Sequence, residues 1–259
     1  MLSMVQVSKD QRGVLTIALN RPDVRNAFNR AVVDDLAQVF NGQALEPDIR
    51  AIVLRGNGTH FCAGGDLQWM RESVELDQAK NFEETRTLAG VFARLNEFPK
   101  PVLGVVQGGA IGGGVGLVSI CDIVLASSEA FFALSEVRLG LIPAVIGPFV
   151  VAKIGASQAR ALILGAERWS AQRAKEIGLI HEIVPSPADL QNASEKILEN
   201  LLQGGPHALA QAKKLVRLLG PRHEDVLDVV ARMLADIRVS EEGQEGVHAF
   251  LEKRKPRCQ

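Results

Sequence analysis

The sequence predicts an α/β protein with one core and a helical C-terminal extension. Strand-like runs followed by glycine loops and helices recur through the first two thirds of the chain, whereas the segment after about Gly147 has helical patterning. The 259 residues suffice to bury a sizeable core, and no low-complexity or Pro- or Ser-rich linker divides them.

The first elements are predicted to be a hairpin and a helix. Residues 4–7 and 14–19 are β-rich runs around the turn residues 10–13. Asn29 is placed to cap a helix over residues 30–40, whose apolar side chains repeat on one face.

Two similar units follow. Residues 51–54 form a predicted buried strand, which leads into a glycine-rich loop at 56–66 and a helix from about 77 to 98. Residues 102–106 form the next strand, followed by the glycine stretch 108–116 and an apolar helix up to Cys121.

The last predicted strands are residues 123–126 and 131–134, and a turn through 135–143 follows them. Beyond Gly147 we expect only helices, interrupted at four positions, which are Gly155, Gly178, Pro206 and Gly220.

Composition excludes several classes of protein. Lys and Arg number 29 against 30 Asp and Glu, so the net charge of -1 provides no general attraction for nucleic acid or an anionic membrane. The longest apolar stretch, 139–152, contains two prolines and is shorter than the ~20 residues of a membrane helix. No signal peptide is indicated, because residues 1–10 contain no basic stretch leading into an apolar core. No disulfide framework is indicated either, because the three cysteines (Cys62, Cys121 and Cys258) are an odd number and are scattered. We expect reduced thiols and a cytoplasmic location.

Common catalytic motifs are missing from the sequence. The histidines and cysteines lack metal-ligand spacing, so no metal site is expected. There is no G-x-S-x-G nucleophile motif, and the glycine stretch 108–116 lacks the Lys-Ser/Thr of a phosphate-binding loop.

Two glycine loops are the strongest chemical signal. Residues 60–66 and 109–114 each follow a buried strand, and glycines there permit close approach of backbone N–H groups to a ligand. Two such donors aimed at one oxygen form an oxyanion hole, in which each donor is worth roughly 3 to 4 kcal/mol of transition-state stabilisation. The alternative is that the glycines only permit tight turns.

Four motifs carry a resemblance to a known family. They are Phe61-Cys62-Ala63-Gly64-Gly65-Asp66-Leu67, the segment 109–114 leading to Cys121-Asp122, residues 135–143 (SEVRLGLIP), and residues 249–254 (AFLEKR). In this order, and covering nearly the whole chain, they make the sequence resemble the crotonase family of enoyl-CoA hydratases and isomerases. Segments 135–150 and 240–256 are most similar to bacterial methylglutaconyl-CoA hydratases.

The resemblance implies a fold, an assembly and a substrate. It implies a crotonase-like spiral of β-β-α turns in residues 1–195, and a helical region in residues 196–259 that mediates formation of a homotrimer or a dimer of trimers. The implied substrate is an acyl-CoA thioester. The favoured pair is 3-methylglutaconyl-CoA and 3-hydroxy-3-methylglutaryl-CoA of leucine catabolism. Coenzyme A is part of that substrate, so no separate cofactor is expected.

The resemblance also implies roles for single residues. The N–H groups of Gly65 and Gly113 would bind the thioester carbonyl. The implied coenzyme A contacts are Ala63 and Leu67 at the adenine end, Arg25 and Ala27 in the N-terminal loop, and Phe250 and Lys253 at the C-terminus. In the family, the C-terminal contact can come from a neighbouring subunit.

Glu136 is the predicted acid-base residue. Its apolar neighbours Leu134 and Leu139 favour the neutral carboxyl and raise its pKa, although pairing with Arg138 is an alternative role. Many hydratases of this family use a second glutamate, but the matching position here is Gly116. A lone carboxylate fits either a hydratase or a double-bond isomerase, and an inactive CoA-ester-binding protein is the non-enzymatic alternative.

A glutaconyl group also carries a distal carboxylate, which needs a partner when buried. The sequence offers two candidates for it, Arg138 and the backbone N–H groups of residues 144–147.

Overall fold

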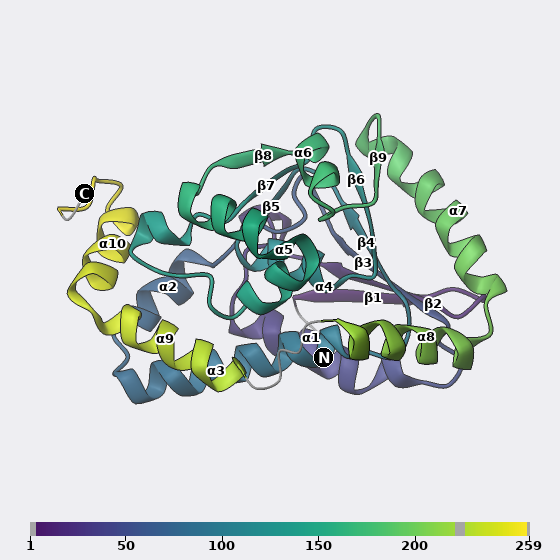
Figure 1. Cartoon of the computed structure of the whole chain (residues 1–259), viewed down its shortest axis with the longest axis horizontal. Coiled ribbons are helices and arrows are strands. Elements are labelled where there is room, and N and C mark those ends of the chain that lie inside the picture. Colours follow the sequence, from purple (N-terminus) through teal and green to yellow (C-terminus); the bar gives the residue numbers. More distant parts are fainter. Residues whose placement is uncertain (1–3, 221–225, 258–259) are drawn as a thin grey trace.

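A computed structural model describes residues 4–220 and 226–257. Predictions for Cys258 therefore lie outside the described residues. Figure 1 shows strands at the centre of the molecule with helices around them, and both sheets belong to one mixed α/β core.

The larger sheet has six strands in the order β1-β2-β3-β4-β6-β9. The predicted hairpin is confirmed, because β1 and β2 pair in antiparallel fashion, while every later pair in this sheet is parallel. Its strands are β1 (Val5–Lys9), β2 (Val14–Leu19), β3 (Ala51–Gly56), β4 (Val102–Val106), β6 (Ile123–Ser127) and β9 (Glu182–Val184).

A smaller sheet, in the order β5-β7-β8, lies beyond the carboxyl ends of β4 and β6. Each of these large-sheet strands is followed at once by a short strand of the small sheet, which gives the repeated β-β-α turn of the crotonase-like spiral. The small strands are β5 (Gly109–Ile111), β7 (Phe131–Ala133) and β8 (Arg168–Ser170).

Helices fill the connections. Asn29 caps the first helix as predicted, since its side chain accepts a hydrogen bond from the amide of Val32. The helices up to Glu176 are α1 (Arg30–Asn41), α2 (Leu67–Val74), α3 (Gln78–Asn96), α4 (Gly113–Ile120), α5 (Gly147–Gly165), which breaks at Gly155, and α6 (Ala171–Glu176).

The structure departs from the sequence analysis at three places. The segment after Gly147 is not purely helical, because β8 and β9 lie within it; each strand has only three residues, too few to show a period. Helix α2 was not predicted, because the residues between the glycine-rich loop at 56–66 and the helix from about 77 were assigned no structure. The glycine stretch 108–116 is not one loop, since it contains β5 and the start of α4.

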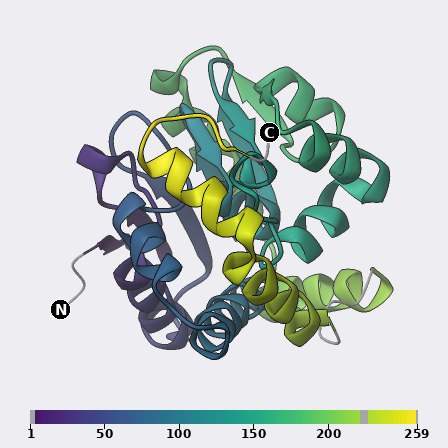
Figure 2. The ribbon, with the colours of Figure 1, turned by 90° about the vertical axis from the view of Figure 1, so that its left-hand side faces the viewer.

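The C-terminal helices are α7 (Leu190–Gln203), α8 (Pro206–Leu219), α9 (Leu227–Val239) and α10 (Glu241–Leu251). Helix α7 covers the outer face of the large sheet, where Leu190 and Leu198 pack with Val53 and Leu103. Helix α9 lies along α3, and α10 packs on α2 (Figures 1 and 2). The division expected between residues 195 and 196 falls inside α7.

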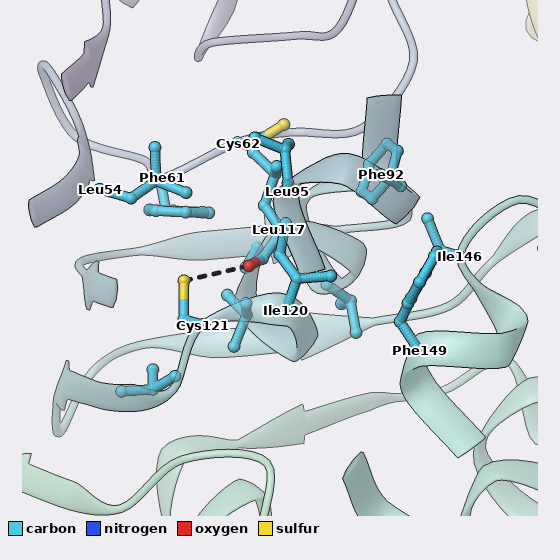
Figure 3. Close-up of a cluster of buried hydrophobic side chains, with 14 of the residues drawn as sticks. Leu54, Phe61, Cys62, Phe92, Leu95, Leu117, Ile120, Cys121, Ile146 and Phe149 are labelled. Carbon is cyan, nitrogen blue, oxygen red and sulfur yellow. Dashed lines mark hydrogen bonds between the residues drawn. The ribbon is translucent and has the colours of Figure 1, made fainter. Parts of the chain in front are cut away.

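The core lies between the other face of the sheet and helices α1, α3, α4 and α5. It includes the fully buried Phe61, Phe92 and Leu117, and Figure 3 shows them with the thiols of Cys62 and Cys121. The Cys121 thiol donates to the carbonyl of Leu117 at 3.2 Å, and burial raises the pKa of both thiols to about 12. Among the described residues, no helix is long and apolar enough to span a membrane.

Candidate active site

One cavity of about 220 Å³ brings together the catalytic residues predicted from the sequence. Gly65, Gly113 and Glu136 all line it, and α2, α3, α9 and α10 supply much of the remaining wall. Most of the wall is apolar. Within the described part of the chain, its lining contains a single carboxylate, Glu136, and a single cationic side chain, Arg238.

Hydrogen bonds on either side of Gly65 hold its backbone in place, while its own N–H is left without an acceptor among the described residues. Phe28 donates its amide to the carbonyl of Gly64 at 2.7 Å, and Asp66 donates its amide to the carbonyl of Phe28 at 2.8 Å. These two bonds flank Gly65, whose own N–H finds no acceptor in residues 4–220 and 226–257. Gly64 adopts a φ of +92°, a left-handed conformation that favours glycine.

The amide of Gly113 is the second free donor. Gly113 is the first residue of α4, where helical N–H groups have no partner within the helix. Gly112 precedes it with a φ of +50° and donates its amide to the carbonyl of Ala133 at 2.9 Å. No acceptor in the described ranges receives the amide of Gly113.

The two glycine loops are bonded to each other. Cys62 donates its amide to the carbonyl of Gly109 at 3.0 Å, and its carbonyl accepts the amide of Ile111 at 2.9 Å. These bonds hold the two loops in register beside the cavity. Two unpaired N–H groups on one cavity wall can stabilise an oxyanion.

Glu136 lies directly beside these loops. It begins a 3₁₀ helix, Glu136–Leu139, and a Cβ atom built on Gly112 would lie only 2.9 Å from its Oε1. Its Oε2 is buried and has no hydrogen-bond partner among the described residues. Burial raises the pKa of Glu136 to about 7, in the direction expected from the sequence. A carboxyl with this pKa can both accept and donate a proton near neutral pH.

The second glutamate's position, Gly116, is enclosed by other side chains. A Cβ atom there would lie 2.3 Å from Cγ2 of Ile146 and 2.8 Å from Cε1 of Phe92. Figure 3 shows Phe92 and Ile146 close to each other, and both line the cavity. The absent carboxylate therefore leaves no empty space, because two apolar side chains occupy it.

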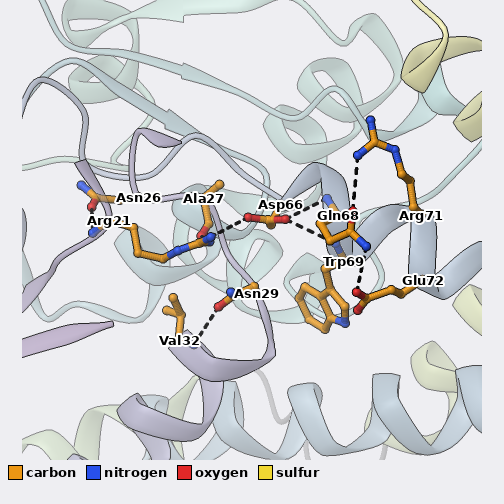
Figure 4. A network of polar contacts seen from close by, with 10 residues as sticks. All are labelled: Arg21, Asn26, Ala27, Asn29, Val32, Asp66, Gln68, Trp69, Arg71 and Glu72. Atoms are coloured by element: carbon orange, nitrogen blue, oxygen red, sulfur yellow. Dashed lines mark hydrogen bonds and ion pairs between the residues drawn. The ribbon is translucent and has the colours of Figure 1, made fainter. Parts of the chain in front are cut away.

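A polar network supports the first glycine loop (Figure 4). Asp66 caps α2 by accepting the amides of Gln68 and Trp69, and it pairs with Arg21 at 2.8 Å. Partial burial opposes ionisation of Asp66, but these hydrogen bonds outweigh it and hold the pKa of Asp66 below its ordinary value. Arg21 also donates to the carbonyl of Ala27 at 2.6 Å, so the network ties the N-terminal loop to the start of α2.

The residues expected to contact coenzyme A fall into two groups. Ala63 and Phe250 line the cavity. Ala27 is buried. Arg25 is exposed, and its backbone carbonyl accepts a hydrogen bond from the amide of Ala63 at 3.0 Å. Leu67 is exposed at the start of α2, and Lys253 is exposed just beyond α10; neither lines the cavity.

The candidates for a distal carboxylate partner need one correction. Arg138 is exposed and does not line the cavity, although it is only two residues from Glu136 in the sequence. Residues 144–146 do line the cavity, but the amide of Gly147 is already bonded to the carbonyl of Pro143 at 2.7 Å.

Two polar residues of the site were missed. Arg238 lies four residues after Leu234 on α9, and both line the cavity. A charged residue on the apolar face of this helix is the sequence feature that could have identified Arg238 as a site residue. Trp69 also lines the cavity, and its Nε1 is buried without a partner in the described residues. The described part of the chain contains no cluster of residues suited to hold a metal ion.

Comparison with known proteins agrees with this geometry. The family model described as enoyl-CoA hydratase/isomerase matches residues 9–259. The 2,3-dehydroadipyl-CoA hydratase of Escherichia coli is 34% identical over 261 residues, which cover 98% of each chain. The peroxisomal Delta(3,5)-Delta(2,4)-dienoyl-CoA isomerase of Arabidopsis thaliana is 31% identical over 270 residues, which cover 99% of this chain and 96% of the isomerase.

A solved structure shows the same similarity. The crystal structure of an enoyl-CoA hydratase from Shewanella pealeana superposes with a TM-score of 0.81 at 40% identity, covering 99% of this chain and 96% of that one. From the motifs, the fold and these matches, the chain belongs to the crotonase family of enoyl-CoA hydratases and isomerases.

Proposed function

We propose that this protein is a hydratase/dehydratase of a short branched acyl-CoA, with 3-methylglutaconyl-CoA and 3-hydroxy-3-methylglutaryl-CoA as its substrate pair. The supporting observation is the cavity in which two free amides, of Gly65 and Gly113, lie beside the buried carboxyl of Glu136. Its modest volume of about 220 Å³ and apolar wall suit a short hydrocarbon chain.

The proposed reaction uses Glu136 for both proton transfers. Ionised Glu136 accepts a proton from water as the water oxygen bonds to C3 of the enoyl thioester. The electron pair of the double bond moves to the thioester oxygen, and the N–H groups of Gly65 and Gly113 bind the resulting enolate. Protonated Glu136 then donates that proton to C2, which completes the addition of water and returns the carboxylate to its starting state.

The same residue serves the reverse reaction. Ionised Glu136 removes the proton from C2 and then gives it to the leaving hydroxyl group. This single-residue scheme requires no second carboxylate, consistent with the side chains of Ile146 and Phe92 that enclose Gly116. It also needs no metal or redox cofactor, because the amides stabilise the charge that develops.

A distal carboxylate on the substrate is consistent with one relative. The 2,3-dehydroadipyl-CoA hydratase of Escherichia coli is named for an acyl group that ends in a second carboxyl. A glutaconyl group has the same feature, and among the described residues the cavity lining includes one cation, Arg238, to receive it.

The second candidate is an enoyl-CoA double-bond isomerase. Glu136, the single carboxylate that the described residues contribute to the cavity, favours it, because moving one proton between two carbons needs only one acid-base group. The dienoyl-CoA isomerase of Arabidopsis thaliana is a relative with that activity in its name.

The remaining contacts belong to the same proposal. Ala63, Leu67, Arg25 and Ala27 contact the coenzyme A portion, and Phe250 and Lys253 complete the site from the C-terminal region. We propose assembly as a homotrimer or a dimer of trimers, in which this region packs against a neighbouring subunit.

Mass spectrometry of the product separates these functions. With 3-methylglutaconyl-CoA, a hydratase adds one water to form 3-hydroxy-3-methylglutaryl-CoA, whereas an isomerase leaves the mass unchanged. Comparison of kcat/KM for this substrate and for crotonyl-CoA then tests the acyl group. Equal values, or a preference for crotonyl-CoA, would contradict the branched substrate and leave a general enoyl-CoA hydratase or isomerase.

A further inference from the structure

Arg238 is the one cationic side chain lining the cavity in the described part of the chain. It comes from α9 and is partly buried, in a wall that also includes Leu234 of the same helix and Leu88 and Phe92 of α3. A guanidinium group among apolar side chains is costly unless it meets an anion or several acceptors.

The side chains that accept hydrogen bonds from the guanidinium of Arg238 are neutral. Its Nη1 donates to Oδ1 of Asn81 at 3.4 Å and to Oγ1 of Thr85 at 3.2 Å. Both partners are almost fully buried on α3, at 0% and 1% exposure, and Asn81 is itself fixed by donating to the carbonyls of Ser73 and Leu76. Nε and Nη2 of Arg238 donate to no acceptor in residues 4–220 and 226–257.

No carboxylate of the described residues lies within ion-pair distance of Arg238. The negative charge of Glu84 on α3 acts on Arg238, although Oε1 of Glu84 pairs with Arg30 at 3.2 Å and its Oε2 is buried without a hydrogen-bond partner among the described residues. Burial lowers the pKa of Arg238, while the charge of Glu84 acts in the opposite direction. Arg238 therefore has two nitrogens that donate to no described residue, and a positive charge that only a more distant carboxylate, Glu84, partly offsets.

Arg238 lines the same cavity as the proposed catalytic groups. Its wall runs from Glu136 and the amides of Gly65 and Gly113 to Arg238 through apolar side chains. Trp69, from α2, supplies a second buried and unpartnered donor to this wall. An acyl chain that places its thioester at the amides would therefore share this cavity with Arg238.

We propose that Arg238 binds a free carboxylate at the far end of the acyl group, and so selects acyl-CoA esters of dicarboxylic acids. This inference rests on the proposed function, since it assumes that the cavity holds the acyl group. It replaces Arg138 as the anchor and competes with the backbone amides of residues 144–146.

The first test measures binding without turnover. Glutaryl-CoA and butyryl-CoA are saturated and differ only by the terminal carboxylate, so the ratio of their Kd values by calorimetry reports on that group. We expect the wild type to favour glutaryl-CoA about 30-fold or more, as for a charge-assisted pair in a buried site. Arg238→Gln should bring the ratio close to 1, and Arg238→Lys should restore part of it.

Arg232→Gln is the matched control, because Arg232 is exposed on the same helix, with its guanidinium over the ring of Phe82. It should leave the Kd ratio unchanged. A wild-type ratio near 1, or a ratio that Arg238→Gln does not alter, would overturn the proposal; the latter result would point to the amides of residues 144–146.

The second test separates this proposal from the proposed function. 3-Methylcrotonyl-CoA differs from 3-methylglutaconyl-CoA only in lacking the carboxylate, and kcat/KM is measured for both. Loss of the preference in Arg238→Gln supports the anchor. If the wild type hydrates both substrates and Arg238→Gln lowers kcat/KM equally for the two, the anchor is overturned while the hydratase function stands. Failure of the wild type to hydrate either, with the Kd ratio intact, would instead refute the function alone.

Discussion

Replacing Glu136 with Gln should reduce activity and raise stability at the same time. The amide keeps the shape of the side chain but can neither accept the proton of water nor return it to C2. We expect kcat to fall by about 10²- to 10⁴-fold, the usual contribution of a positioned proton-transfer group, while the CoA ester still binds.

The stability effect follows from burial of the carboxyl. Its pKa is raised from 4.5 to about 7, which disfavours the ionised form in the folded protein by about 3 kcal/mol. Below pH 4.5 the group is neutral in both states and there is no penalty. Between pH 4.5 and about 7 only the unfolded chain loses the proton, so the free energy of unfolding falls as pH rises. Above this range the full penalty applies.

Urea unfolding at fixed protein concentration checks this prediction. Glu136→Gln should be more stable than the wild type by up to about 3 kcal/mol at about pH 8 and equal to it at about pH 4. The control is Glu129→Gln, an exposed carboxylate in the turn between β6 and β7, which should change neither activity nor this pH dependence. Near-normal turnover, or a stability difference independent of pH, would refute the assignment.

Four further predictions follow from the same structure. In the wild type, kcat/KM should fall below about pH 7 in both reaction directions, because ionised Glu136 starts each of them; a kcat/KM that does not change between about pH 5 and pH 8 would contradict this role of Glu136. Gly116→Ala should cost about 1 to 3 kcal/mol by overpacking against Ile146, measured as a lower Tm; an unchanged Tm would argue against that close contact. Asp66→Asn should lower kcat roughly tenfold by loosening the loop that carries Gly65, and unaltered kinetics would show that the network is not needed. Removing residues 241–259 should weaken both trimer formation and CoA-ester affinity, since α10 and Phe250 are lost; a full-length chain that sediments as an active monomer would defeat this idea.

The sequence was most informative where local chemistry decides the structure. The hairpin of β1 and β2 and the cap at Asn29 follow from turn and capping residues, and both are as predicted. The raised pKa of Glu136 also follows from its apolar neighbours. Strands β8 and β9 were not predictable in this way, because tertiary pairing rather than a periodic pattern defines three-residue strands.

The site contained features that only the fold reveals. Arg238 contacts Asn81 and Thr85, which lie more than 150 residues away in sequence, so no local pattern joins them. Arg138 was favoured by closeness in sequence to Glu136, yet its side chain is exposed. The space beside Gly116 is taken by Ile146 and Phe92, which come from distant segments. Long-range packing, and not residue type, decided each of these cases.

A crystal structure with glutaryl-CoA bound tests the central claim most directly. The thioester oxygen should lie about 2.7 to 3.1 Å from the amide nitrogens of both Gly65 and Gly113, with the carboxyl of Glu136 facing C2 and C3 of the acyl chain. A thioester oxygen that contacts neither amide, or an acyl chain bound away from Glu136, would contradict the proposed catalytic site.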